Sequence, residues 1–315
     1  MKLVGIISFA IIAMLTGLSI KGIASKNAVL APDYYASFAS AAPLEQKYSQ
    51  LGSYEVASAD FPSENKAIQK YRFWYPAELE KTEKQYPVIL VVNASGTPAA
   101  KYEAWFQRLT SWGFVVVGNE DPQTGTGETT SLTLDYLLHL PEDHILYGKL
   151  DTNKIGLVGF SQGGAGALAA ATEYENGSVY KAIFTGSAAY PFLSENLGWH
   201  YDLTKVKIPY FMVAGTGTSD DRGVNDYEKE FGGVSPLAAM QESYQLLSDH
   251  CFKVLARAVG AEHGEIFARS DGYMTAWMLY QLMGDTEAAK AFAGEDAEIL
   301  HNINWQDVEL SLIHI

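Results

Sequence analysis

The sequence contains a single cysteine, Cys251, among 315 residues. An intrachain disulfide is therefore excluded, and the cysteine and histidine spacing fits no zinc site, so we predict no metal. The surrounding stretch, SDHCFKVL, has the composition of a segment that enters a strand. Free cysteines in such segments are usually buried, and we expect Cys251 to be a core thiol.

Basic residues are also scarce. Lys and Arg total 22 against 37 Asp and Glu, which gives a formal net charge of −15. A nucleic-acid partner requires a basic face that can neutralise phosphates. The charge balance therefore argues against nucleic-acid binding.

Charge is absent altogether from residues 3–20, which lie between Lys2 and Lys21. An apolar run of this length at an N-terminus is typical of a secretory signal peptide or a membrane anchor. We predict that residues 1–24 are one of these two. The protein is then secreted or extracytoplasmic, either released or attached to a membrane through residues 3–20.

The remaining chain divides into a predicted linker with a short helix, residues 25–60, and one domain, residues 61–315. In this domain short apolar runs alternate with segments of helical periodicity. The alternation predicts an α/β fold with a mostly parallel central sheet and helices on both faces. The expected strands are 67–76, 86–96, 114–121, 153–160, 180–189, 208–217 and 251–261. The expected helices are 99–113, 130–142, 163–174, 234–249 and 272–292.

One serine stands between glycines at the end of a predicted strand. Residues 159–163 read GFSQG, and a helix of small residues follows. On such a strand–turn–helix the serine adopts a strained backbone, and its hydroxyl is presented at the carboxyl edge of the sheet, near the positive end of the helix. An ordinary Gly/Ser turn can share the pattern, but the context favours a nucleophile. We predict that Ser161 is that nucleophile.

A serine nucleophile needs a histidine base and a carboxylate that orients it, each in a loop after a later strand. Among the histidines that follow Ser161, His263 directly follows a predicted strand and is flanked by glycines. The loop after the strand 208–217 offers Asp220 and Asp221. We choose Asp220 for its spacing from the strand and keep Asp221 as the alternative. One of the pair can cap a helix while the other orients the base.

Charge that develops on an attacked carbonyl oxygen is stabilised by two backbone N–H groups. Gln162, the residue after the nucleophile, is expected to supply one of them. The second is expected from the loop NASGTPAA, which follows an earlier strand. There we favour Thr97, with Gly96 and Ser95 as alternatives.

These segments resemble the α/β-hydrolases, and within them the branch of dienelactone hydrolases and cutinase-like polyester hydrolases. The likeness is carried by YPVILVVNASGT, WFQRLTSWGFVVV, LDTNKIGLVGFSQGGAGAL and GYMTAWMLYQLMGDTEAAKAF. The resemblance implies an α/β-hydrolase catalytic domain with Ser161, Asp220 and His263 as a catalytic triad. It also implies that Thr97 supplies an oxyanion amide and that Tyr190, in SAAYPF, lines the substrate cleft.

Three features depart from that family pattern. The oxyanion loop opens with NASG in place of a histidine- or proline-glycine pair, and the stretch RGVNDYEKEFGG adds residues after the acid. The disulfide of many cutinase-like enzymes cannot form with one cysteine. These departures concern the substrate more than the fold.

Together the features predict a serine carboxylester hydrolase that works through an acyl-enzyme, without a metal or organic cofactor. The expected substrates are short-chain or polyester-like esters, either small molecules or polymers. A serine peptidase acting on small peptides is one alternative, because such enzymes share the order serine, acid, histidine. A non-catalytic binding protein on the same fold is the other, because a fold does not determine a function.

Overall fold

The computed structural model describes residues 29–311 of the chain. The predicted leader, residues 1–24 with its apolar stretch 3–20, lies outside the described residues. Within residues 29–311, no helix is both long enough and apolar enough to cross a bilayer.

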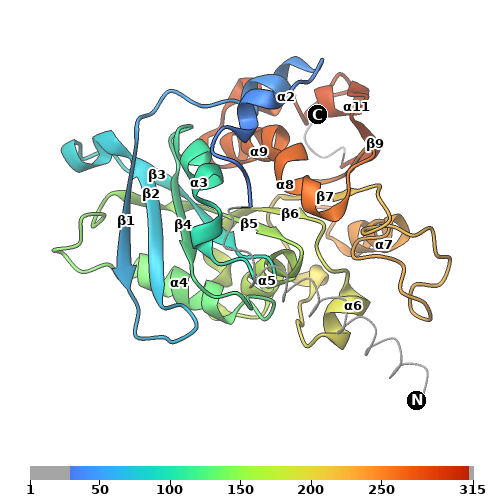
Figure 1. The fold of residues 1–315 in the computed structure, drawn as a ribbon, viewed down its shortest axis with the longest axis horizontal. Helices are drawn as coiled ribbons and strands as arrows, with labels where there is room; N and C mark the ends of the chain where they lie inside the picture. Colours follow the sequence, from blue (N-terminus) through green and yellow to red (C-terminus); the bar gives the residue numbers. More distant parts are fainter. Residues whose placement is uncertain (1–28, 312–315) are drawn as a thin grey trace.

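A nine-stranded sheet forms the centre of residues 29–311, with helices on both faces (Figure 1). The strand order is β1-β2-β4-β3-β5-β6-β7-β8-β9. The six strands from β4 to β8 in this order are parallel, while β1, β2 and β9 are antiparallel. This arrangement confirms the predicted α/β class with a mostly parallel sheet. The strands are β1 (Val56–Pro62), β2 (Lys70–Pro76), β3 (Tyr86–Val92), β4 (Val115–Asn119), β5 (Leu150–Phe160), β6 (Tyr180–Gly186), β7 (Tyr210–Gly215), β8 (Lys253–Ala258) and β9 (Trp305–Leu310).

Helices connect most of the strands. The α-helices are α2 (Pro43–Tyr48), α3 (Glu103–Thr110), α4 (Glu128–Leu138), α5 (Gln162–Thr172), α6 (Pro191–Asn196), α7 (Leu237–Leu246), α8 (Ile266–Arg269), α9 (Asp271–Met283), α10 (Thr286–Ala289) and α11 (Glu298–His301). Short 3₁₀ helices are η1 (Tyr34–Ser37), η2 (Ala77–Lys81), η3 (Ala99–Lys101), η4 (Glu175–Val179), η5 (Leu203–Lys205) and η6 (His263–Glu265).

The sheet separates two hydrophobic cores. Every residue of β3 is buried, and successive side chains alternate between the cores. Val88 and Leu90 belong to the core that α4, α5 and α7 cover, whereas Ile89 and Val91 belong to the core under α3 and α9. Figure 1 shows α4 and α5 on one side of the sheet and α2, α3 and α9 on the other. A strand buried on both faces explains why its sequence is continuously apolar.

The order of the strands creates a switch point between β3 and β5. The chain passes from β3 to β4 on one side and then returns to β5 on the other. The loops after β3 and β5 therefore leave the sheet in opposite directions. In open α/β sheets, ligands bind at the carboxyl ends of the strands beside such a point. Ser161 and the loop that contains Thr97 both lie there.

Two expectations about elements were wrong. The segment 272–292 is two helices instead of one, because Gly284 adopts the left-handed conformation (φ 67°) and ends α9. The edge strands β1 and β9 were not predicted. They are only partly buried, so neither sequence shows the continuous apolar run that marks the inner strands.

The segment before β1 docks onto the C-terminal part of the chain. Glu45, in α2, is 1% exposed and accepts hydrogen bonds from Trp305 Nε1 (2.6 Å) and Asn302 Nδ2 (2.8 Å). Glu298 in turn accepts from the Leu44 and Glu45 amides at the start of α2. The predicted linker, residues 25–60, thus contains a helix that packs on α9 and α11.

Candidate active site

Ser161 occupies the tight turn between β5 and α5. Its backbone lies at φ 55° and ψ −124°, a conformation that residues other than glycine rarely adopt, and 8% of the residue is exposed. The glycines around it permit the turn. A Cβ on Gly159 would lie 2.1 Å from Gly163 O, and one on Gly163 would lie 2.1 Å from Val92 O at the end of β3. The strained backbone at Ser161 is the geometry that the GFSQG motif predicts.

Asp220 and His263 are brought together at the carboxyl ends of β7 and β8. His263 Nδ1 lies 2.6 Å from Asp220 Oδ1, with the histidine side chain 18% exposed and the carboxylate fully buried. A carboxylate only accepts hydrogen bonds, so the ring proton lies on Nδ1 and Nε2 is left as an acceptor. The pair has the arrangement of a base and the acid that orients it.

The two loops that carry this pair are joined to each other. Gly217 N donates to Ala261 O at 2.9 Å, and Ser219 N donates to the Glu262 carboxylate at 3.1 Å. The His263 loop also reaches the Ser161 turn. Phe160 stacks on Phe267 with ring centroids 4.1 Å apart. Consequently the turn after β5 and the loops after β7 and β8 form one packed unit at the carboxyl edge.

Asp221 has a different set of partners. Its carboxylate pairs with Arg257 and accepts from the amides of Gly223 (2.9 Å) and Leu237 (3.3 Å), the first residue of α7. Burial raises the pKa of Asp221, but these hydrogen bonds and the Arg257 charge outweigh it, so the pKa lies below its ordinary value. Between the two aspartates that the sequence left open, Asp220 is the one that contacts His263.

Ser187 was not singled out from the sequence. It directly follows β6 at φ 47°, is 2% exposed, and its hydroxyl donates to Asp220 Oδ2. Gly215 N donates to the same oxygen at 2.8 Å. The signal that could have identified Ser187 is its place immediately after a buried strand, at the same edge of the sheet as Ser161.

The loop after β3 was expected to supply an oxyanion amide. Here Thr97 N donates to Ala94 O at 3.0 Å, which closes a turn, and Gly96, at φ 68°, makes it type II. Gly96 N donates to Pro122 O at 3.0 Å. Among residues 29–311, Ser95 N has no acceptor.

Gln162 is the first residue of α5. First-turn amides have no acceptor within their own helix, so the Gln162 N–H faces out of the helix end beside Ser161. Its side chain is 2% exposed, and Nε2 donates to Gln123 Oε1 at 3.0 Å. The side chain of Gln162 is thus held by Gln123, away from the backbone N–H.

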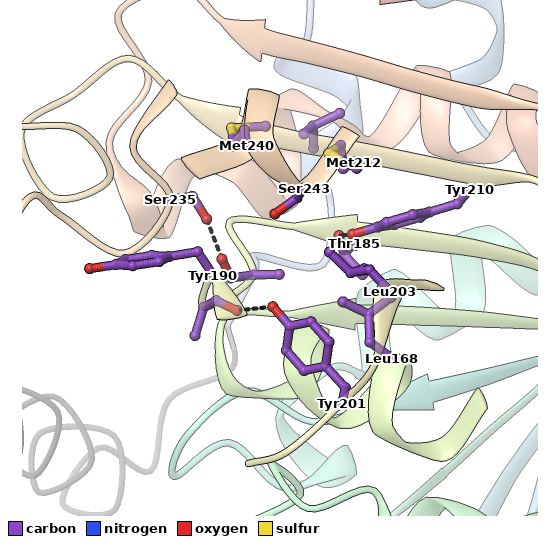
Figure 2. A pocket seen from close by; sticks show the side chains of 13 residues that line it. Leu168, Thr185, Tyr190, Tyr201, Leu203, Tyr210, Met212, Ser235, Met240 and Ser243 are labelled. Carbon is purple, nitrogen blue, oxygen red and sulfur yellow. Dashed lines mark hydrogen bonds between the residues drawn. The ribbon is translucent and has the colours of Figure 1, made fainter. Parts of the chain in front are cut away.

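Tyr190 is buried and packs in the core. It is 4% exposed, and its hydroxyl donates to Tyr227 O at 3.1 Å. It borders a cavity of about 30 Å³, and Figure 2 shows its ring extending away from the other labelled side chains. In the same view, Tyr201 donates to Ala189 O and Thr185 meets Tyr210. Such a cavity holds a water molecule but no ester substrate. Tyr190 thus borders this cavity, and its ring packs against Tyr227.

Cys251 is 1% exposed, and its thiol donates to Ile208 O at 2.9 Å. Burial raises the pKa of this thiol to about 11. The expectation of a buried core thiol is confirmed.

A sequence model of the PET hydrolase-like family matches residues 42–217, more than half of the chain. The chain belongs to this family. It is therefore an ester-hydrolysing protein of the α/β-hydrolase type, as the resemblance implied. No individual curated protein matches the sequence.

The match to the PET hydrolase-like family includes the turn with Ser161 and the loop with Thr97, and it ends at Gly217. Asp220 and His263 lie beyond it. Their association therefore rests on the strands that carry them and on the contact between them.

Proposed function

We propose that the protein is a serine carboxylester hydrolase with Ser161 as nucleophile, His263 as base and Asp220 as the acid that orients it. The observation that carries the proposal is the contact of His263 with the buried Asp220 carboxylate, in loops packed against the strained Ser161 turn. Each residue follows a parallel strand, in the order that this architecture requires.

In the proposed reaction, His263 Nε2 takes the hydroxyl proton as Ser161 Oγ attacks the ester carbonyl. The alcohol leaves with that proton, and an acyl-enzyme remains on Ser161. Water, deprotonated by His263, then attacks the acyl group, and the released carboxylic acid restores Ser161. The Asp220 carboxylate stabilises the imidazolium. The scheme calls for no metal or organic cofactor.

The oxyanion is assigned to the Gln162 amide and to one amide of the loop after β3. We keep Thr97 as the second donor. This requires that its N–H either leaves Ala94 O for the oxyanion or donates to both oxygens at once. A Ser95→Pro variant separates the candidates, because proline fits this position of a type II turn and removes only the Ser95 amide. We expect kcat within about threefold of wild type; a loss of about 100-fold or more would assign the oxyanion to Ser95 instead.

The proposed substrates are short-chain or polyester-like esters, as small molecules or as polymers. We propose a secreted or extracytoplasmic location, with membrane attachment through residues 3–20 as the alternative to cleavage. Nucleic acid is not among the proposed partners, because the net charge of −15 disfavours it.

Hydrolysis of p-nitrophenyl acetate, butyrate and octanoate by wild type and Ser161→Ala tests the proposal. We expect kcat/KM to be highest for the shorter esters, to rise with pH through the histidine range near about 6.5, and to fall by about 1,000-fold or more in the variant. Ser194→Ala is the matched control, since its buried hydroxyl donates to Ala189 O and Ser194 is not among the proposed site residues. If Ser161→Ala hydrolyses these esters as fast as wild type, Ser161 is not the nucleophile.

A further inference from the structure

Ser187 links the ends of two strands to the carboxylate of Asp220. Its amide donates to Val213 O in β7 at 2.7 Å, and its hydroxyl donates to Asp220 Oδ2. The residue is 2% exposed, so bulk water does not compete for the hydroxyl. The hydrogen bond of the Ser187 amide to β7 therefore helps to fix the direction of the hydroxyl.

The Asp220 carboxylate has three donors from three different strand ends. His263 binds Oδ1, while Gly215 N and the Ser187 hydroxyl bind Oδ2. The carboxylate is fully buried, so these groups replace the water that would otherwise solvate the anion. Among the three, the Ser187 hydroxyl is the only side-chain donor besides the histidine.

The backbone of Ser187 indicates that its side chain is needed. At φ 47° a serine is strained, whereas a glycine would adopt the conformation without cost. Gly186, one residue earlier, shows that the turn already contains a glycine. Strained non-glycine residues persist where the surrounding structure requires them, and they cluster at functional sites. The contact that the serine adds is the bond to Asp220.

We propose that Ser187 is a positioning residue of the hydrolytic site, whose hydroxyl fixes the Asp220 carboxylate and lowers its effective negative charge. The inference rests on the proposed function. Ser187 acts through Asp220 and His263 and does not touch the substrate.

Removing the hydroxyl has a predictable consequence for the pH profile. With one donor fewer, the Asp220 anion attracts protons and the imidazolium more strongly. Both effects oppose the loss of the proton from the His263 imidazolium in the variant. The acid limb of kcat/KM must therefore move to higher pH.

The experiment compares wild type, Ser187→Ala, Ser187→Gly and the Ser194→Ala control on p-nitrophenyl butyrate from pH 5 to 9, with thermal unfolding alongside. We expect kcat to fall about tenfold in both Ser187 variants, with KM changed less than about twofold and the acid limb moved up by about half a pH unit. Ser187→Gly should unfold at a temperature no lower than Ser187→Ala, because glycine relieves the strained φ. Ser194→Ala should match wild type in kcat and in pH profile.

If Ser187→Ala does not fold, Ser187→Gly provides the same kinetic measurement without the backbone strain. A folded Ser187 variant with wild-type kcat and an unmoved acid limb would overturn the inference. The proposed function would still stand in that case, provided that Ser161→Ala is inactive. A fully active Ser161→Ala would instead refute the proposed function and this inference with it. The two failures are therefore distinguishable.

Discussion

Asp220 and Asp271 are both buried, and both are paired with a basic side chain. Asp271 contacts Arg108, which is 0% exposed, and accepts from Trp105 Nε1 at 2.8 Å and Tyr34 at 2.6 Å. Arg108 and Trp105 belong to α3, Tyr34 belongs to η1, and Asp271 is the first residue of α9. Asp220 contacts His263, whose side chain is partly exposed at the carboxyl edge of the sheet.

The comparison shows that burial and pairing do not by themselves indicate catalysis. The Arg108–Asp271 pair is enclosed by other groups of the core. Arg108 also donates to Tyr48 O (2.7 Å) and to Thr275. It joins the segment before β1 to the helices α3 and α9. In the Asp220–His263 pair the histidine side chain is 18% exposed, and its second ring nitrogen is not used by the contact with Asp220. Access at the sheet edge is what separates a chemical role from a structural one.

The largest effect expected from this comparison is on activity at the sheet edge. In Asp220→Asn the amide can no longer hold the proton on His263 Nδ1, so kcat should fall by about 1,000- to 10,000-fold. Ester hydrolysis measured beside circular dichroism checks this. A folded variant with more than a tenth of the wild-type kcat would contradict the role of Asp220.

The matched change in the closed pair should affect stability instead. Asp271→Asn leaves the Arg108 charge buried without its partner, which costs on the order of 3–5 kcal/mol of unfolding free energy. Urea unfolding measures the loss, and kcat per folded molecule should stay within about threefold of wild type. A variant with normal stability and a large loss of kcat would remove the distinction between the two pairs.

A smaller effect is expected at the adjacent aspartate. Asp221→Asn removes the charge that pairs with Arg257 and should cost about 1–2 kcal/mol at pH 7. The folded pKa of Asp221 lies below its unfolded value, so this stability is present above that value and is lost as the pH falls through the folded pKa.

Unfolding of wild type and Asp221→Asn across pH tests the sign. The difference between them should shrink below about pH 4 and should be constant near neutrality. A difference that grows on acidification would mean that the carboxylate is not the stabilising form. Hydrolysis by Asp221→Asn should remain within about tenfold of wild type, in contrast to Asp220→Asn.

Much of the fold could be predicted from the chain because the inner strands have a local signature. β3, β7 and the part of β5 from Ile155 onward are buried on both faces and are therefore apolar. The edge strands β1 and β9 lack that signature and were missed. Gly284 does carry a local signal for the end of α9, although apolar residues recur beyond it as far as Phe292.

The residues of the candidate site also divide into those with a local signature in the sequence and those without one. Ser161 could be predicted from the sequence because the residues that permit its turn, Gly159 and Gly163, are its near neighbours in the chain. Ser187 carries no such local signal, since its hydrogen-bond partner Asp220 lies in the loop after another strand, β7. Tyr190 was expected in the cleft from a resemblance, and packing against Tyr227 covers its ring.

The sequence by itself determined the α/β class, the strained serine turn and the choice of His263, because each depends on a local pattern of residues. Only the tertiary structure showed that Asp220, not Asp221, contacts His263, that Ser187 bonds the Asp220 carboxylate and that the Thr97 amide bonds Ala94 O. The physical reason is that adjacent side chains leave the backbone in different directions. Which one meets His263 depends on how β7 and β8 lie side by side, and no short stretch of sequence contains that information.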